Sequence, residues 1–217
     1  MTGDLLPAKV LATHTIANVS ETLAEKLGLP PEYRSIGIIT ADSDDVTYCA
    51  LDEATKAAAV EVVYGRSLYA GAANASTKLA GEVIGILAGP NPAEVQSGLR
   101  SCVDFMESGV GFRSANEDDS VIYFAHTVSR TGSYLSKTAG VKEGEALAYL
   151  IAPPLEAVVG LDEAMKASDV ELVALFEPPS ETNFGGGLLT GTQSACNAAA
   201  SAFAEAVKAV AARPREI

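Results

Sequence analysis

Four consecutive polar residues, Asp42-Ser43-Asp44-Asp45, begin two residues after the apolar run Ile36–Ile39, which is typical of a buried strand. In one class of phosphatase, a strand delivers an Asp-x-Asp pair that supplies a nucleophile and an acid, with Mg²⁺ held by the carboxylates. Asp42 and Asp44 have that spacing. Such enzymes also need a lysine and a further acidic pair in the same domain, and nothing in the sequence clearly supplies them.

The same carboxylates can act through their charge alone. Asp44 and Asp45, together with Glu82, would present negative charge at a strand end, and an acidic concavity favours small cations over anions. A solvated turn, in which an aspartate side chain bonds to its own backbone, explains the pattern equally well. The residues alone leave both interpretations open.

The other reactive side chains form no recognisable active site. His14 and His126 each lie in a strand-like run, where a histidine with a hydrogen-bond partner is more common than a catalytic base. Cys49, Cys102 and Cys196 lie far apart, without a Cys-x-x-Cys motif or a histidine at zinc-ligand spacing. Because no nucleophile is paired with a base, we expect no enzymatic activity, no metal and no cofactor.

The composition of the chain limits the kinds of molecule that it is expected to bind. The formal net charge of the 217 residues is −13, whereas a nucleic-acid partner requires clustered lysine and arginine. No run approaches the roughly 18 apolar residues that a membrane span requires. The first residues lack a secretory pattern, and an odd number of cysteines suits a reducing interior. We therefore expect a cytoplasmic protein that binds neither nucleic acid nor membrane.

The elements that would position these side chains occur twice in the chain. Leu51–Lys56 returns as Leu161–Lys166 with five of six positions identical, and the strand-like run that follows repeats at the same offset of 110 residues. A duplication of this length predicts two domains, residues 1–109 and 110–217. Each is expected to be an α/β sandwich of one sheet and covering helices.

The order of predicted elements is similar in the two copies. The first copy is expected to contain strands at 9–17, 36–39, 60–64 and 82–87, and helices at 20–27, 51–59 and 91–106. The second is expected to contain strands at 121–128, 146–151 and 170–176, and helices at 161–167 and 193–211. The last helix carries a stripe of mostly small apolar residues, which favours close packing on a sheet.

Two long segments, residues 65–80 and 177–187, fall at the same place in both copies and are interpreted as loops. Loops of this length in a compact domain are usually functional, although a tolerated surface insertion is the alternative. The second segment ends in Gly185-Gly186-Gly187, which we interpret as flexible. The copies differ at the aligned strand end. Asp42–Asp45 of the first copy aligns in sequence with Ala152-Pro153-Pro154-Leu155 of the second, which we interpret as a rigid apolar turn.

Long strings of residues resemble the EutL-type shell proteins of ethanolamine-utilization bacterial microcompartments. The resemblance covers almost the whole chain, and its markers are Leu29–Pro31, Ile39–Tyr48, Val62–Gly71, Ala88–Glu94, Val128–Leu135 and Pro179–Asn183. It implies a structural protein of a microcompartment shell rather than an enzyme. It further implies two circularly permuted microcompartment (BMC) domains in tandem, each a mainly antiparallel sheet covered by helices.

The resemblance also implies an assembly. Three chains would form a homotrimer that imitates a hexamer, tile with other shell proteins and carry gated pores for small molecules such as ethanolamine. Fusing two unlike copies in one chain would let a ring of six domains carry three-fold chemistry.

Residue roles follow from the same resemblance. Small pores within each subunit place Asp44, Asp45, Glu82 and Phe112 as ligand-binding residues, in which carboxylates suit the ammonium group of ethanolamine and Phe112 packs on it.

Gating of a central pore is assigned to the two long segments. Tyr69 and Phe184 are the candidates for occluding side chains, while Gly71 and Gly185 would absorb the backbone change, and Asn183 lies in the same segment. Two alternatives are kept beside this interpretation: a metal-dependent phosphatase-like enzyme that uses Asp42 and Asp44, and a soluble sensor of small amines.

Overall fold

The structure is a computed structural model that describes residues 1–68, 79–178, 180 and 182–215. Contacts divide the chain into two compact units. The unit called here the N-unit contains Pro7–Val110 and Gly132–Leu135, and the C-unit contains Met1–Leu6, Gly111–Thr131 and Ser136–Ile217. Each unit therefore includes a short segment from the other half of the sequence. The domain boundary at residue 109 stays a prediction.

The N-unit is built on a four-stranded antiparallel sheet in the order β2-β3-β5-β4. Its elements are β2 (Val10–Ile16), α1 (Glu21–Leu27), β3 (Ser35–Ala41), α2 (Asp44–Ala57), β4 (Glu61–Ser67), β5 (Val83–Gly89) and α3 (Pro92–Glu107). The central strand β3 is almost wholly buried because both of its faces are covered. α2 and α3 pack on one face, where Leu51 and Val95 approach the strands, and α1 packs Ala24 and Leu27 against the cluster around Ile36.

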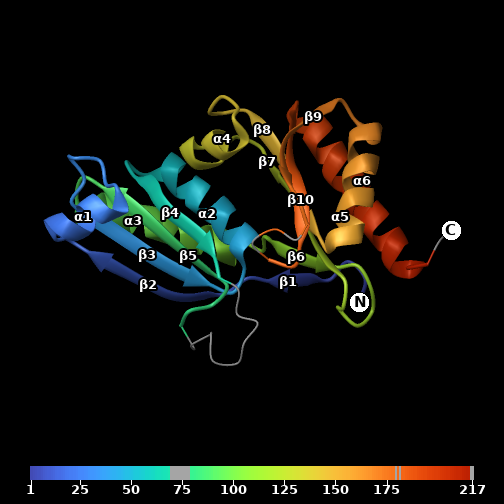
Figure 1. Cartoon of the computed structure of the whole chain (residues 1–217), viewed down its shortest axis with the longest axis horizontal. Coiled ribbons are helices and arrows are strands. Elements are labelled where there is room, and N and C mark those ends of the chain that lie inside the picture. Colours follow the sequence, from blue (N-terminus) through green and yellow to red (C-terminus); the bar gives the residue numbers. More distant parts are fainter. Residues whose placement is uncertain (69–78, 179, 181, 216–217) are drawn as a thin grey trace. The chain divides into compact units, whose positions relative to one another are not determined.

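The C-unit contains a six-stranded sheet in the order β1-β6-β7-β8-β10-β9. Its strands are β1 (Leu5–Pro7), β6 (Gly111–Ser114), β7 (Ile122–Val128), β8 (Ala146–Ala152), β9 (Val170–Phe176) and β10 (Gly185–Gly191), and its helices are α5 (Pro154–Ala167) and α6 (Gln193–Ala212). α4 (Ser133–Ala139) begins in the segment that packs with the N-unit and ends in the C-unit. Figure 1 shows α5 and α6 side by side on one face of the sheet.

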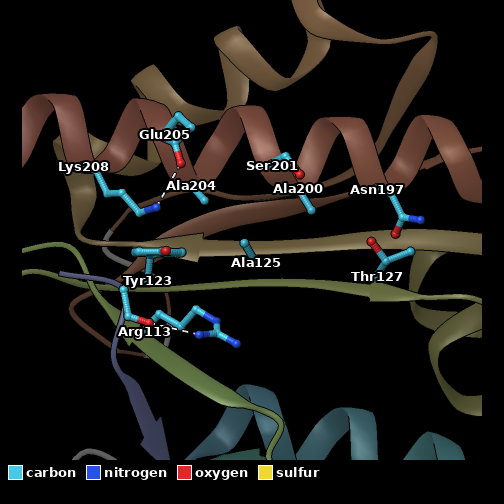
Figure 2. A pocket seen from close by; sticks show the side chains of 11 residues that line it. Arg113, Tyr123, Ala125, Thr127, Asn197, Ala200, Ser201, Ala204, Glu205 and Lys208 are labelled. Atoms are coloured by element: carbon cyan, nitrogen blue, oxygen red, sulfur yellow. Dashed lines mark hydrogen bonds and ion pairs between the residues drawn. The ribbon is translucent and has the colours of Figure 1, made fainter. Parts of the chain in front are cut away.

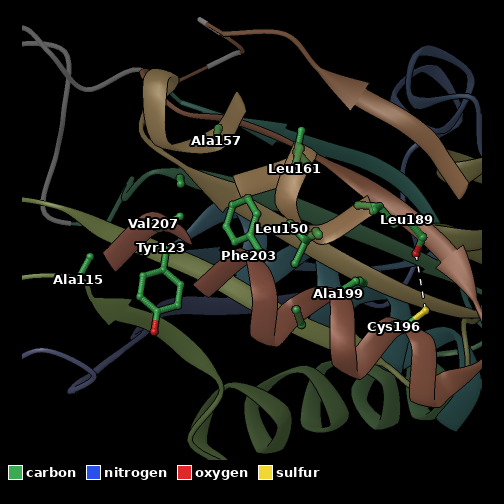
Figure 3. Close-up of a cluster of buried hydrophobic side chains, with 14 of the residues drawn as sticks. Ala115, Tyr123, Leu150, Ala157, Leu161, Leu189, Cys196, Ala199, Phe203 and Val207 are labelled. Carbon is green, nitrogen blue, oxygen red and sulfur yellow. Dashed lines mark hydrogen bonds between the residues drawn. The ribbon is translucent and has the colours of Figure 1, made fainter. Parts of the chain in front are cut away.

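The core of the C-unit lies between this sheet and the two helices. Phe203 of α6 is fully buried and packs in one cluster with Leu150 of β8, Leu161 of α5 and Leu189 of β10 (Figure 3). The two helices approach closely because Gly160 of α5 has no side chain. A Cβ atom at Gly160 would lie 2.6 Å from Cδ2 of Phe203, which is below any normal contact.

Most predicted elements are present, and several boundaries are wrong. α2 and α5 each begin seven residues before the predicted starts at Leu51 and Leu161. Asp44 and Asp45 form the first turn of α2, where negative charge complements the helix dipole. Pro154 opens α5, because a proline at the first helical position loses no hydrogen bond. The segment Ala152–Leu155 is therefore the end of a strand and the start of a helix, not an apolar turn.

Strands extend into both segments that were predicted to be loops. β4 continues to Ser67, and Gly185–Gly187 form the buried first half of β10 rather than a flexible segment. Gly186 is required there by close packing of strands, since a Cβ atom would lie 1.9 Å from the carbonyl oxygen of Leu150. The prediction missed β1, β6, β10 and α4 altogether. The stripe predicted for the last helix consists of Ala195, Ala199, Ala202, Phe203, Ala206 and Val210. In α6, Cys196 and Val207 are buried beside Phe203, whereas Ala202 and Val210 are only partly buried.

Candidate functional site

Three strand ends in the N-unit meet at one edge of the sheet and carry the predicted acidic residues. Ala41 at the end of β3 pairs with Val83 at the start of β5, and Ser67 at the end of β4 pairs with the same Val83. The amide of Glu82 donates a 2.8 Å hydrogen bond to the carbonyl oxygen of Ala41. Asp42 and Glu82 therefore extend from neighbouring strands at the same edge.

The Asp44 carboxylate is held by hydrogen bonds on both oxygens. Ser67 donates its hydroxyl to Oδ2 at 2.7 Å, and the backbone amide of Asp45 donates to Oδ1 at 2.9 Å. The hydroxyl of Tyr48 lies 2.7 Å from Ser67 Oγ and completes the chain of bonds. The orientation of this carboxylate is fixed by groups from α2 and β4, before any ligand is present.

Asp45 and Ser43 place further polar groups at the start of α2. Asp45 is only 8% exposed. The buried hydroxyl oxygen of Ser43 has no hydrogen-bond partner among the described residues, and it forms no side-chain cap to the helix. A buried hydroxyl in this state is unusual in a folded protein, since water or a ligand normally satisfies such a group.

Glu82 lies in an electrostatically unfavourable place for a carboxylate. Although the residue is exposed, its pKa is raised above the ordinary value, first by partial desolvation of the carboxylate and then by repulsion from Asp44 and Asp42. Asp42 is engaged differently, because its Oδ1 accepts the backbone amide of Lys9 at 2.6 Å. The carboxylates of Asp42, Asp44 and Glu82, called here the acidic edge, therefore produce a negative potential that a bound small cation would reduce.

The remaining predicted site residues that the structure describes belong to the C-unit. Phe112 belongs to β6 of the C-unit, where its ring packs 5.5 Å from that of Phe124 and 5.7 Å, edge to face, from that of Phe184. Asn183 is exposed and Gly185 is the first residue of β10. Tyr69 and Gly71 lie outside the described residues.

A groove that the sequence analysis missed lies in the C-unit, between β7 and α6 (Figure 2). Its volume is about 560 Å³, with alanine side chains on its floor. Lys208 forms a 2.9 Å ion pair with Glu205, and Arg113 donates to the carbonyl oxygen of Gly3 at 3.0 Å. The wall of the groove that α6 forms could have been found from the sequence. Asn197, Ser201 and Glu205 recur every four residues, so they lie on one face of the helix, and all three are exposed.

The cysteines and acidic residues provide no reactive centre among the described parts of the chain. Burial raises the pKa of the Cys102 thiol to about 12, and burial followed by the charges of Asp45 and Asp52 raises the pKa of Cys49 well above its ordinary value. No group of three histidine, cysteine or acidic residues in the described ranges is placed to hold a metal ion. None of the described helices is long and apolar enough to cross a membrane.

Comparison with known proteins gives consistent matches. Residues 35–115 match the BMC domain. The chain is 68% identical to the bacterial microcompartment shell protein EutL of Clostridium perfringens, over 99% of each chain. It is 54% identical to the protein of the same name from Escherichia coli, over 97% of this chain and 96% of the relative.

Solved structures agree with these matches. The crystal structure of the ethanolamine utilization protein EutL from Leptotrichia buccalis has a TM-score of 0.97 and 69% identity, covering 100% of both chains. A trimeric shell protein PduB shares the fold at 20% identity, with a TM-score of 0.75 over 94% of this chain and 89% of its own.

Proposed function

Because the chain belongs to the EutL family of bacterial microcompartment shell proteins, we propose that three copies of it form a flat ring whose pores admit small molecules. The shell role is structural rather than catalytic, as it is for the relatives. It belongs to the ethanolamine-utilization microcompartment and implies association with other shell proteins.

The duplication supports the ring. Both units contain a sheet and helices in the same order, from β2 to α3 in one and from β7 to α6 in the other. Three chains would supply six such units around one axis. Ring formation by repeated contacts between unlike surfaces needs no further component.

The acidic edge supports a role in recognising a small amine. The observation that carries this proposal is the clustering of Glu82 with Asp44 and Asp42, whose charges add to the effect of desolvation in raising the pKa of Glu82. A protonated amine such as ethanolamine would neutralise part of this charge, and the buried Ser43 hydroxyl offers a partner for its alcohol group. Asp45 completes the proposed set in the N-unit, and Phe112 of the C-unit is kept as a candidate ligand residue through its ring face.

Gating of the central pore is proposed for Tyr69, Gly71, Asn183, Phe184 and Gly185. The contact between the rings of Phe184 and Phe112 supports this assignment. It joins a residue of the proposed gate to a residue of the proposed ligand site within one unit. A change at the gate would therefore alter the surroundings of Phe112.

Calorimetric titration of ethanolamine into the purified protein tests the amine site. Asp45→Asn and Glu82→Gln should each weaken binding at least about tenfold, because each removes a carboxylate from the cation. Asp104→Asn is the matched control, since it removes the same charge from an exposed position on α3. Unchanged affinity in the first two variants would remove those residues from the site.

The two alternative functions make different predictions. A phosphatase would use Asp42 as nucleophile, yet its Oδ1 is engaged by the Lys9 amide, and the relatives are shell proteins rather than enzymes. A soluble amine sensor would bind the ligand without assembling. Electron microscopy of the concentrated protein separates this alternative from the shell component, which should form two-dimensional sheets.

A further inference from the structure

One face of α5 exposes apolar side chains to solvent in the C-unit. Leu155 is 57% exposed and Val158 is 59% exposed, and Met165 is also exposed. With Asp162 they recur at spacings of three and four residues, so all four lie on one side of the helix. An exposed apolar helix face of this kind marks a binding surface.

The equivalent face of α2 is covered within the N-unit. α2 and α5 are both 14 residues long and start 110 residues apart, so Tyr48, Asp52 and Thr55 correspond to Val158, Asp162 and Met165. The cover is the segment Gly132–Leu135, which belongs to the N-unit although it follows β7 in the sequence.

Specific contacts hold this cover in place. Asp52, which is fully buried, accepts the amide of Gly132 at 2.7 Å and that of Leu135 at 2.8 Å. Thr55 Oγ1 accepts the amide of Ser133 at 3.1 Å. The rings of Tyr48 and Tyr134 lie 6.3 Å apart.

The covering segment also has a counterpart, and that counterpart is exposed. α1 and α4 are both seven residues long and start 112 residues apart, at Glu21 and Ser133. Each is followed by a glycine in the left-handed region, Gly28 with φ of 67° and Gly140 with φ of 68°. Leu23 therefore corresponds to Leu135.

Burial distinguishes the two counterparts. Leu135 is 1% exposed, whereas Leu23 is 42% exposed, and α1 buries none of its residues. The chain thus contains a helix face on α2 that is covered, and the segment Gly132–Leu135 that covers it. It also contains an equivalent uncovered face on α5 and an equivalent unused cover, Ser20–Leu23.

We propose that Ser20–Leu23 of one copy of this chain covers the α5 face of a second copy. By correspondence with the N-unit, Val158 packs beside Thr22 of the other copy, and Asp162 accepts the amides of Ser20 and Leu23. The ion pair of Asp162 with Lys166 does not obstruct this, because the corresponding Lys56 lies 3.6 Å from the buried Asp52.

The interface joins two different surfaces, so every copy offers one of each. Head-to-tail contacts of this type generate a closed ring when the rotation between copies closes, and an open filament when it does not. The inference rests on the proposed three-chain ring and names the residues that form it. It excludes an interface in which the two copies use the same surface.

Cysteine cross-linking tests the pairing directly. Native Cys49, Cys102 and Cys196 are buried, so introduced cysteines react selectively. With a short bismaleimide, the double variant Thr22→Cys, Val158→Cys should give covalent dimers and trimers. Each single variant alone should give only monomer, and a mixture of the two single variants should give dimer and nothing larger. Cross-linking of either single variant to itself would overturn the head-to-tail arrangement.

Light scattering of surface variants distinguishes an error in the proposed interface from an error in the proposed three-chain ring. Leu23→Glu and Val158→Glu should each weaken assembly at least about tenfold, because they place a charge in the apolar contact. Leu175→Glu is the control, since Leu175 is an exposed leucine on β9, an element that belongs to neither surface. Circular dichroism should show an unchanged fold, because both target side chains are exposed. A trimeric wild type with trimeric variants would overturn the interface alone, while a monomeric wild type would overturn both proposals.

Discussion

At the scale of single residues, the charges proposed to bind an amine at the acidic edge also oppose folding. The pKa of Glu82 is raised by burial and by Asp44 and Asp42, so its ionised form destabilises the folded chain. This cost is absent below the unfolded pKa of about 4.3, develops as pH rises through the folded pKa, and is complete above it. A cation that binds there would offset the same repulsion.

Glu82→Gln should therefore raise the thermal unfolding midpoint at pH 7 while it weakens amine binding. The difference from the wild type should shrink as the pH falls and vanish below about pH 4, where Glu82 is protonated in both states. Differential scanning fluorimetry across this range measures it. A lower midpoint for the variant at pH 7 would show that Glu82 is held by favourable contacts instead.

Asp52 has the opposite character, since its buried carboxylate is satisfied by the amides of Gly132 and Leu135. Asp52→Ala should lower the free energy of unfolding by about 3 kcal/mol, because both amides lose a charged acceptor. Glu53→Ala on the same helix is the control and should change it by less than about 0.5 kcal/mol. Equal effects in urea titrations of the two variants would contradict this role for Asp52.

At the scale of elements, close helix packing in the C-unit depends on Gly160. Gly160→Ala gains helix propensity of about 1 kcal/mol. The added methyl group would meet the fully buried ring of Phe203 at 2.6 Å, and overpacking of this kind costs about 1–3 kcal/mol. We expect a net loss of about 1 kcal/mol. Gly98→Ala in α3, whose nearest contact would be 3.0 Å, should be near neutral in the same urea titration.

The sequence predicted the elements whose signals are local. Asn91 is a clear example, because its side chain accepts the amide of Glu94, as the Asn-Pro-x-Glu pattern indicates. The starts of α2 and α5 were misplaced because Asp44-Asp45 and Pro153-Pro154 signal turns as well as first helical turns. α4 was missed because its stabilising acceptor, Asp52, lies 80 residues away from Gly132 in the sequence.

The candidate site was predictable only in part, for the same reason. Asp44, Asp45 and Glu82 could be found because they sit next to apolar strands. The bond from Ser67 to Asp44 could not, because it requires the pairing of β4 with β5 and the start of α2 at Asp44. The groove beside α6 also depends on tertiary packing, since its walls come from distant segments.

At the scale of the whole molecule, the two copies share a skeleton and differ in chemistry. Asp45 at the start of α2 is 8% exposed and acidic, whereas the corresponding Leu155 of α5 is 57% exposed and apolar. One copy therefore carries an acidic edge, and the other carries the exposed apolar face of α5 that we assign to assembly. In the proposed ring of six units, each feature would occur three times.

The difference between the two copies predicts how many ethanolamine molecules bind to each chain. Calorimetric titration should give about one ethanolamine bound per chain, because only the N-unit carries the Asp42–Asp45 edge. Glu82→Gln should weaken this single class of site. Two equivalent sites per chain would show that binding follows the shared skeleton of the two copies rather than the acidic residues.

The assembly state is the most direct test of the whole account. Native mass spectrometry of the purified chain at micromolar concentration should give a single species with three times the 22.3 kDa mass of one chain. A stable monomer, or a dimer as the largest species, would contradict the proposed ring.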